Sequence, residues 1–233
     1  MPNTSDSQST YYRTLREQIE QEHPFSNNTD IAYELIFHEI VTGALQAGDQ
    51  IRQENLASNL DMSRTPVREA LLRLEQNKYL ERTAGGGFQI RKPDIKDYVD
   101  FYEFRLLLEP KAAWFAARNI SDDQLTLLKQ NMNQLKSAMA EKDKYHISLL
   151  DNRFHEIIAD ASNNTYLRQT ILQYQDKSMF HLQIVLYESN LRFMYNKHRE
   201  IYEAILRSDE AAAEAAMRSH LQLYIKNICS VYP

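Results

Sequence analysis

The chain has 233 residues, of which 43% are hydrophobic and 25% are charged, and its formal net charge is −5. This balance is typical of a globular protein of two domains with a sizeable core, and the negative charge excludes a surface coated with nonspecific affinity for nucleic acid, although a local cluster of arginines can still bind DNA. There is no apolar run of about 18 residues, no signal peptide and only one cysteine, Cys229, so we expect a cytoplasmic protein without disulfides or membrane contact.

Glycine and proline divide the chain into two parts. All five glycines lie in the first 87 residues, and proline is absent between Pro110 and the last residue. These residues are the strongest breakers of regular structure. The long stretch without them is rich in Leu, Ala, Gln, Glu and Lys, and it therefore predicts a helical bundle.

Three segments are expected along the chain. Residues 1–25 form an N-terminal extension that we expect to be partly disordered, because its first ten residues are rich in Ser, Thr and Gln. A small domain with turns follows over 26–92, and an all-helical domain over 94–231. The boundary lies at Pro93, where proline ends a strand and the next aspartate caps a helix.

The small domain shows the element order helix, short strand, helix, tight turn, helix and glycine-tipped hairpin. This order predicts a winged helix-turn-helix, a mainly helical fold with a small β wing. In such folds the second helix of the pair enters the major groove of DNA with its N-terminal residues near the base edges. The elements are expected at 30–42, 50–51, 53–60, 63–77 and 79–90.

Side chains at the start of that second helix indicate DNA binding. Ser63 is the expected N-cap, and Arg64, Thr65 and Arg68 lie clear of the apolar stripe. Arginine makes bidentate contacts to guanine, and the free backbone N–H groups of a helix start hold phosphate. The alternative is a helix-turn-helix used only for packing, which has no need of paired arginines.

The helical domain contains an aspartate and three histidines that could share a metal ion. Asp151 and His155 are four residues apart and therefore lie on one helix face, while His198 and His220 lie on two successive helices. One oxygen and three nitrogen ligands suit Zn, Ni, Mn, Co or Fe rather than Ca or Mg. Spacing alone leaves open that these are ordinary structural histidines. The helices are expected at 94–118, 121–141, 144–162, 164–188, 192–208 and 210–231.

The string LASNLDMSRTPVREALLRLEQNKYLERTAGGGF resembles the DNA-binding domain of the GntR family of bacterial regulators. The resemblance implies that two arginines read bases, that a threonine contacts phosphate and that the glycine wing enters the minor groove. Two positions depart from the family pattern, because Asp61 replaces the usual turn glycine and Glu54 stands where some members carry a basic residue. The expected DNA-binding set is Arg52, Ser63, Arg64, Thr65, Arg68, Gly86 and Gly87.

The strings FYEFRLLLEPKAAWFAA, LDNRFHEIIADASNN and HREIYEAILRSDEAAAEAAMRSHL resemble the FCD ligand-binding domain of the FadR-type subfamily. The resemblance implies a divalent metal, Zn, Ni or Mn, held by Asp151, His155, His198 and His220. It also implies that Arg105 binds the carboxylate of an effector, since guanidinium is the natural bidentate partner of a carboxylate. Tyr102 is expected on the same face. The alternative for Arg105 is an intrahelical pair with Glu109.

These features together predict a transcription regulator rather than an enzyme. We expect a repressor that binds double-stranded operator DNA as a homodimer and responds to an organic acid. Two alternatives remain open. In one, the metal site activates water and the protein is a metalloenzyme, although the sequence offers no obvious general base beyond Glu156, which is adjacent to His155. In the other, the metal itself is the signal.

Overall fold

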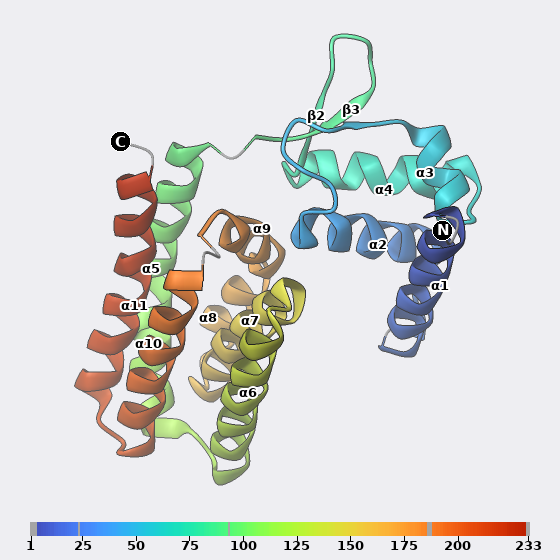
Figure 1. The fold of residues 1–233 in the computed structure, drawn as a ribbon. Coiled ribbons are helices and arrows are strands. Elements are labelled where there is room, and N and C mark those ends of the chain that lie inside the picture. Colours follow the sequence, from blue (N-terminus) through green and yellow to red (C-terminus); the bar gives the residue numbers. More distant parts are fainter. Residues whose placement is uncertain (1–3, 23, 93, 186–187, 232–233) are drawn as a thin grey trace. The chain divides into compact units, whose positions relative to one another are not determined.

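The computed structural model describes residues 4–22, 24–92, 94–185 and 188–231 (Figure 1), and it falls into two compact units, Met1–Lys92 and Pro93–Pro233. The first unit holds a small sheet among helices and the second is all helical, so the predicted fold class is confirmed. Among the described residues, no helix combines the length and the hydropathy needed to cross a bilayer.

The first unit contains four helices and three short strands in its described part. The strands form an antiparallel sheet in the order β1-β3-β2, with Ile51 opposite Phe88 and Glu81 opposite Gln89. The elements are α1 (Thr4–Glu22), α2 (Asn28–Thr42), β1 (Gln50–Ile51), α3 (Gln53–Asn59), α4 (Arg64–Gln76), β2 (Leu80–Arg82) and β3 (Phe88–Ile90).

Local sequence explains why α2 and α4 form where they do. Asn27 and Asp30 build a capping box at the start of α2, and Gly43 ends that helix in the left-handed conformation with φ of 77°. Helix α4 packs against α2 through an apolar stripe at helical spacing. The buried residues of that stripe are Val67, Ala70, Leu71 and Leu74.

Helix α1 lies within the N-terminal extension. It begins at Thr4 and runs for 19 residues. Its side chains Tyr12, Leu15 and Ile19 are buried, at spacings of three and four that bring them to one face, and the helix packs against α2. Tertiary packing of this apolar face therefore stabilises the part of the helix that follows the first ten residues.

The turn between α3 and α4 gives a testable consequence of the Asp61 departure. Asp61 has φ of 51°, a left-handed conformation that glycine adopts without steric cost. Asp61→Gly is expected to raise the free energy of unfolding of the first unit by about 1 kcal/mol. Native-state hydrogen exchange of the α3 and α4 amides measures the gain. Asp61→Ala is the control and should not stabilise, so an equal gain from alanine would contradict the conformational explanation.

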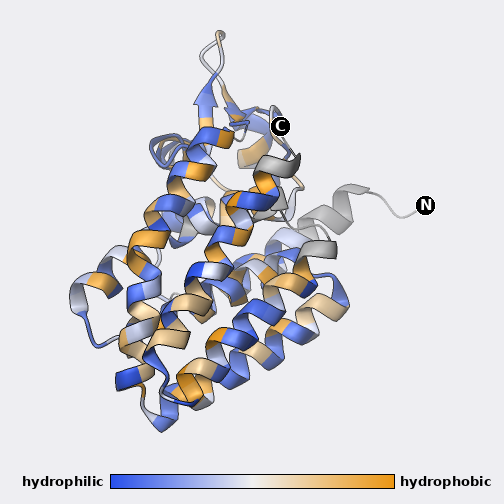
Figure 2. Cartoon of the chain, turned by 90° about the vertical axis from the view of Figure 1, so that its left-hand side faces the viewer, coloured by the Kyte–Doolittle hydropathy of each residue, from blue (hydrophilic) through white to orange (hydrophobic). Residues whose placement is uncertain are grey.

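The second unit is a bundle of helices. Figure 2 shows hydrophilic and hydrophobic residues alternating along them, as expected for helices that bury one face. Helix α5 packs along α11, and α6 along α7. The described elements are α5 (Ile95–Asn119), α6 (Asp122–Glu141), α7 (Lys144–Ala161), α8 (Thr165–Leu172), α9 (Gln175–Val185), α10 (Glu188–Leu206) and α11 (Glu210–Val231).

The prediction of a single helix over residues 164–188 is wrong. The chain breaks at Gln173 and Tyr174 between α8 and α9. The break accompanies a tertiary contact, because the ring of Tyr174 packs edge-on against Phe101 and Phe104 of α5. Its hydroxyl also donates to Glu109 of α5. The local sequence therefore favours one continuous helix, whereas the packing of Tyr174 against α5 favours a break.

Candidate metal centre and nucleic-acid interface

The N-terminal end of α4 exposes the side chains predicted to read DNA. Ser63, Arg64, Thr65 and Arg68 are all exposed, whereas the neighbouring Val67 is fully buried. The Ser63 hydroxyl makes no capping hydrogen bond to the helix, so it is available to an outside acceptor. The structure thus brings four predicted residues to one surface.

Arg64 has a partner within the protein that the sequence did not predict. Its Nη1 atom lies 3.0 Å from Oε1 of Glu54 on α3, and both side chains are about 70% exposed. Gln53 of α3 donates to the backbone carbonyl of Arg64 at 3.0 Å. The Glu54 carboxylate therefore partly neutralises a cation at the start of α4.

The wing is closed by backbone hydrogen bonds from Thr83 N–H to the Gly87 carbonyl and from Gly86 N–H to the Thr83 carbonyl, and Arg82 Nη1 also donates to the Gly86 carbonyl at 3.4 Å. Gly86 has φ of 79°, and the Gly87 N–H donates to Thr83 Oγ1 at 3.1 Å. Arg82 is turned back onto the protein, because its guanidinium covers the Phe88 ring at 4.1 Å and Nε lies 2.8 Å from Glu75. Both glycines are exposed at the hairpin tip, which Figure 1 shows extending beyond the sheet.

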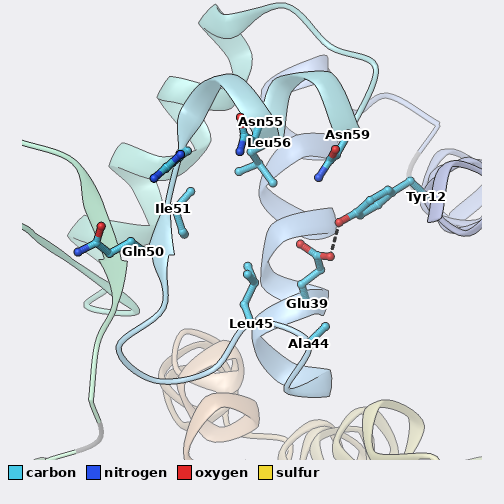
Figure 3. Close-up of a pocket in the computed structure, with 10 residues that line it drawn as sticks. Tyr12, Glu39, Ala44, Leu45, Gln50, Ile51, Asn55, Leu56 and Asn59 are labelled. Atoms are coloured by element: carbon cyan, nitrogen blue, oxygen red, sulfur yellow. Dashed lines mark hydrogen bonds between the residues drawn. The ribbon is translucent and has the colours of Figure 1, made fainter. Parts of the chain in front are cut away.

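Arg52 lies at the N-cap of α3, next to Gln53, whose side chain contacts the backbone of Arg64. It borders a cavity of about 390 Å³ in the first unit. Figure 3 shows Tyr12 of α1 and Glu39 of α2 meeting in this cavity, where the tyrosine hydroxyl donates to the carboxylate. Burial raises the pKa of Glu39, although the hydrogen bond from Tyr12 opposes the shift.

In the second unit, the predicted ligand residues converge. Asp151 and His155 extend from α7, His198 from α10 and His220 from α11, and all four side chains are at most 5% exposed. One candidate ligand atom from each lies within 4.8 Å of the others. Atoms that share an ion at about 2.1 Å stand roughly 3 to 4 Å apart, so the group needs only small adjustments to hold one.

The individual distances show which atoms face one another. Nε2 of His155 lies 3.3 Å from Nε2 of His220. Each nitrogen can offer a lone pair, so a shared cation would lie between the two atoms. Nε2 of His198 lies 3.2 Å from Oδ1 of Asp151. Neither of these two atoms makes a hydrogen bond of good geometry. Buried polar atoms without partners are rare in native proteins, and a metal ion would satisfy them.

The protonation states also suit metal ligands, which bind as neutral imidazole and as carboxylate. Burial lowers the pKa of His198 and, more strongly, of His220. Burial acts in the opposite direction on Asp151, but the close approach of His198 outweighs burial and lowers the pKa of Asp151. An oxygen donor and three nitrogen donors thus meet in one buried place.

Glu109 is a component of the site that sequence reasoning did not place there. Its Oε2 lies 2.5 Å from Nδ1 of His155, and Tyr174 donates to its Oε1 at 2.8 Å. Metal-bound histidines usually place a carboxylate on the second ring nitrogen, which fixes the tautomer and leaves the other nitrogen for the metal. The position of Glu109 on α5 gave no signal of its contact with α7.

Arg105 makes the intrahelical pair that we had kept as an alternative. Its Nε donates to Glu109 Oε1 at 2.5 Å, and its Nη1 donates to Ser178 Oγ of α9 at 3.0 Å. Burial raises the pKa of Glu109, but the charge of Arg105 and the contact with His155 reverse the shift and hold it well below its usual range. Arg105 is 1% exposed. It is linked to the histidine cluster through Glu109, which also contacts His155.

Tyr102 lies one turn before Arg105 on the same helix. The guanidinium of Arg105 lies 5.0 Å from its ring centroid. The Tyr102 ring is 5.0 Å from the ring of Tyr224, which in turn lies 5.1 Å from His220. The structure therefore brings both residues predicted for effector binding to the border of the histidine cluster.

Comparison with known proteins agrees with this division of the chain. Residues 100–223 match the family model described as FCD domain, and residues 28–90 match the model described as bacterial regulatory proteins, gntR family. The regulator YdhC of Bacillus subtilis is 27% identical over 184 residues, covering 78% of this chain and 82% of YdhC. The transcriptional repressor RspR of Escherichia coli is 24% identical over 197 residues, covering 82% of this chain and 84% of RspR.

A solved structure extends the comparison to the fold. McbR/YncC of E. coli superposes with a TM-score of 0.74 at 24% sequence identity, covering 90% of this chain and 100% of that chain. This similarity supports the architecture of a winged helix-turn-helix followed by a helical bundle.

Proposed function

The chain belongs to the GntR family of bacterial regulators and carries an FCD domain, and from this premise we propose that an organic acid bound at a metal centre controls its binding to DNA. The chain is thus a DNA-binding transcription regulator, and its relatives are named as regulators. The observation that carries the proposal is the buried group Asp151, His155, His198 and His220 with Arg105 at its border.

The proposed metal is a divalent transition ion, with Zn, Ni or Mn the expected candidates. When bound, the ion supplies coordination positions to which a carboxylate can bind. Glu109 orients His155 through Nδ1. Arg105 supplies a positive charge beside the cluster, and the effector carboxylate shares this guanidinium with Glu109.

The proposed DNA complex is that of a homodimer on double-stranded DNA, with one α4 helix in each half-site. Ser63, Arg64, Thr65 and Arg68 enter the major groove, Gly86 and Gly87 of the wing approach the minor groove, and Arg52 contacts the backbone. The proposed DNA-binding domain covers residues 26–92 and the proposed helical domain covers residues 94–231. Both follow the N-terminal extension 1–25. A DNA target implies a cytoplasmic protein, and the name of RspR supports a repressor.

One experiment tests the regulatory proposal directly. DNA that binds the purified full chain is selected from a random library, and its affinity is measured by fluorescence anisotropy in three states: stripped of metal, loaded with metal, and loaded with metal plus organic acids. An affinity change that requires an acid supports the proposal. A change produced by metal alone identifies a metal sensor instead, and consumption of an acid identifies an enzyme.

The Glu54–Arg64 pair gives a further prediction for the DNA surface. Glu54→Gln removes a negative charge that occupies Arg64, so affinity for the selected DNA is expected to rise about two- to fivefold. Anisotropy titrations at several salt concentrations measure the change. Glu69→Gln, an exposed glutamate of α4 whose carboxylate accepts a hydrogen bond from Thr29, is the matched control. A fall in affinity would show that Glu54 itself contacts the DNA.

A further inference from the structure

The cavity of the first unit is lined by residues of α1, α2, β1 and α3, and of the loop that follows α2. Its volume of about 390 Å³ is within the range usual for small-molecule sites. Tyr12 of α1 lines it, although α1 precedes residues 28–90, the part of the chain that matches the gntR family model. The cavity is thus completed by a helix outside the matched region.

A buried carboxyl group faces this cavity. Glu39 is 7% exposed, and the hydroxyl of Tyr12 donates to its Oε1. Figure 3 shows the other carboxyl oxygen of Glu39 turned away from Tyr12, toward the space between Leu45 and Leu56. Burial raises the pKa of Glu39, and no cation of the described residues acts against this shift. A buried carboxylate without a positive partner is costly, so a ligand that supplies a cation gains from this place.

Aliphatic and carboxamide side chains make up most of the remaining lining. The aliphatic side chains include Leu45, Ile51 and Leu56, and the carboxamides are those of Gln50, Asn55 and Asn59. Ile51 and Leu56 are buried, whereas all three carboxamides are exposed. Among the lining residues, Arg52 carries the only positive charge, so a second cationic group on a ligand would find no anionic partner besides Glu39.

We infer that this cavity binds a small primary amine, whose ammonium group donates to Glu39 and whose uncharged polar end meets the carboxamides of Asn55 and Asn59. Such amines are protonated at neutral pH, as lysine is. A short aliphatic chain between the two ends packs against Ile51 and Leu56. All of these residues lie in the first unit, so the inference does not depend on the metal centre and stands if the organic-acid proposal fails.

The position of α3 links this cavity to the DNA surface. Asn55 and Asn59 are on the same short helix as Gln53 and Glu54, and these two contact Arg64 at the start of α4. A ligand that rests on α3 therefore acts on the helix that positions Arg64. We expect the bound amine to change the affinity for the selected DNA by about fivefold or more.

Calorimetry on the full chain with four-carbon probes tests the binding site. 4-Amino-1-butanol should bind about tenfold or more tighter than 1,4-butanediol, which has no ammonium group, because hydrogen bonds between charged groups are the strong ones. It should also bind several times tighter than 1-butylamine, which has no polar end. Equal binding of the diol, or no heat of binding from either amine, overturns the inference.

A charge variant places the amine in the cavity. Glu39→Gln keeps the size of the side chain and an acceptor for Tyr12 but removes the negative charge, so the affinity for 4-amino-1-butanol should fall about tenfold or more. Glu17→Gln makes the same substitution on an exposed position of α1, beside Arg13, and should leave the affinity unchanged. An unchanged affinity in a folded Glu39→Gln protein overturns the inference.

A second variant decides the matter if Glu39→Gln does not fold. The double variant Asn55→Leu/Asn59→Leu changes exposed positions of α3, so it leaves the core intact. It should remove the preference for 4-amino-1-butanol over 1-butylamine, and an unchanged preference overturns the inference.

Fluorescence anisotropy with the selected DNA tests the link to α3. Adding 4-amino-1-butanol should change the affinity of the natural chain and leave that of Glu39→Gln unchanged. An equal change in Glu39→Gln overturns the assignment of the site, and no change in the natural chain overturns the coupling through α3.

Discussion

The double variant Arg64→Ala/Arg68→Ala is expected to lose specific DNA binding while keeping its fold. Both side chains are exposed at the start of α4, outside the stripe that packs against α2, so their removal leaves no cavity. Each bidentate arginine–guanine contact contributes about 1 to 3 kcal/mol of discrimination, so the loss for two is roughly 30-fold to 10⁴-fold. Fluorescence anisotropy with the selected DNA and a scrambled duplex measures it, and circular dichroism checks the fold.

Arg73 of the same helix provides the matched control. Its Nη1 lies 3.0 Å from Asp30, and its guanidinium covers the Tyr33 ring at 4.2 Å, so it acts in the fold of the first unit. Arg73→Ala removes the same charge and should lower thermal stability with little change in specific affinity. If Arg73→Ala weakens binding as much as Arg64→Ala does, net charge rather than base contact accounts for the effect. Unchanged affinity in the double variant would refute the proposal that α4 reads DNA through Arg64 and Arg68.

The parts of the fold that the sequence predicted are those set by short-range pattern. Val67, Ala70, Leu71 and Leu74 repeat at helical spacing, and the structure buries all four. Glycine and proline marked the turns of the first unit for the same local reason. The break of the helix at Tyr174 was not predictable in this way, because it accompanies contacts with side chains of α5 that lie far away in the sequence.

The residues of the candidate site differ in how far the sequence alone could predict them. Asp151 and His155 follow from helical geometry, but the joining of His198 and His220 to them depended on the family resemblance. Glu109 was visible only as a possible partner of Arg105, four residues away. Its contact with His155 crosses from α5 to α7, and the pair of Glu54 with Arg64 crosses from α3 to α4. Contacts between elements depend on how helices pack, which periodicity alone does not fix.

The largest effect expected in the second unit concerns metal. The triple variant His155→Ala/His198→Ala/His220→Ala should contain no stoichiometric metal, because it removes three of the four ligands. An ion that binds only the folded state stabilises that state by about 4 kcal/mol when the free ion concentration is a thousand times the dissociation constant. The natural chain should therefore melt at a clearly lower temperature after chelation, whereas the triple variant should show no shift. Elemental analysis and thermal melts with and without chelator measure both effects.

Two further variants separate metal binding from packing. Three alanines in a buried cluster also leave cavities that destabilise the fold, so the shift on chelation, rather than the melting temperature itself, is the deciding quantity. Asp151→Asn keeps the side-chain volume and removes the anionic ligand, so it should weaken metal binding without a cavity. His146→Ala, on α7 but exposed and paired with Asp143, should retain both metal and shift. One bound ion per chain in the triple variant would refute the four-residue site, because no other group of three or more metal-ligating side chains was found among the described residues.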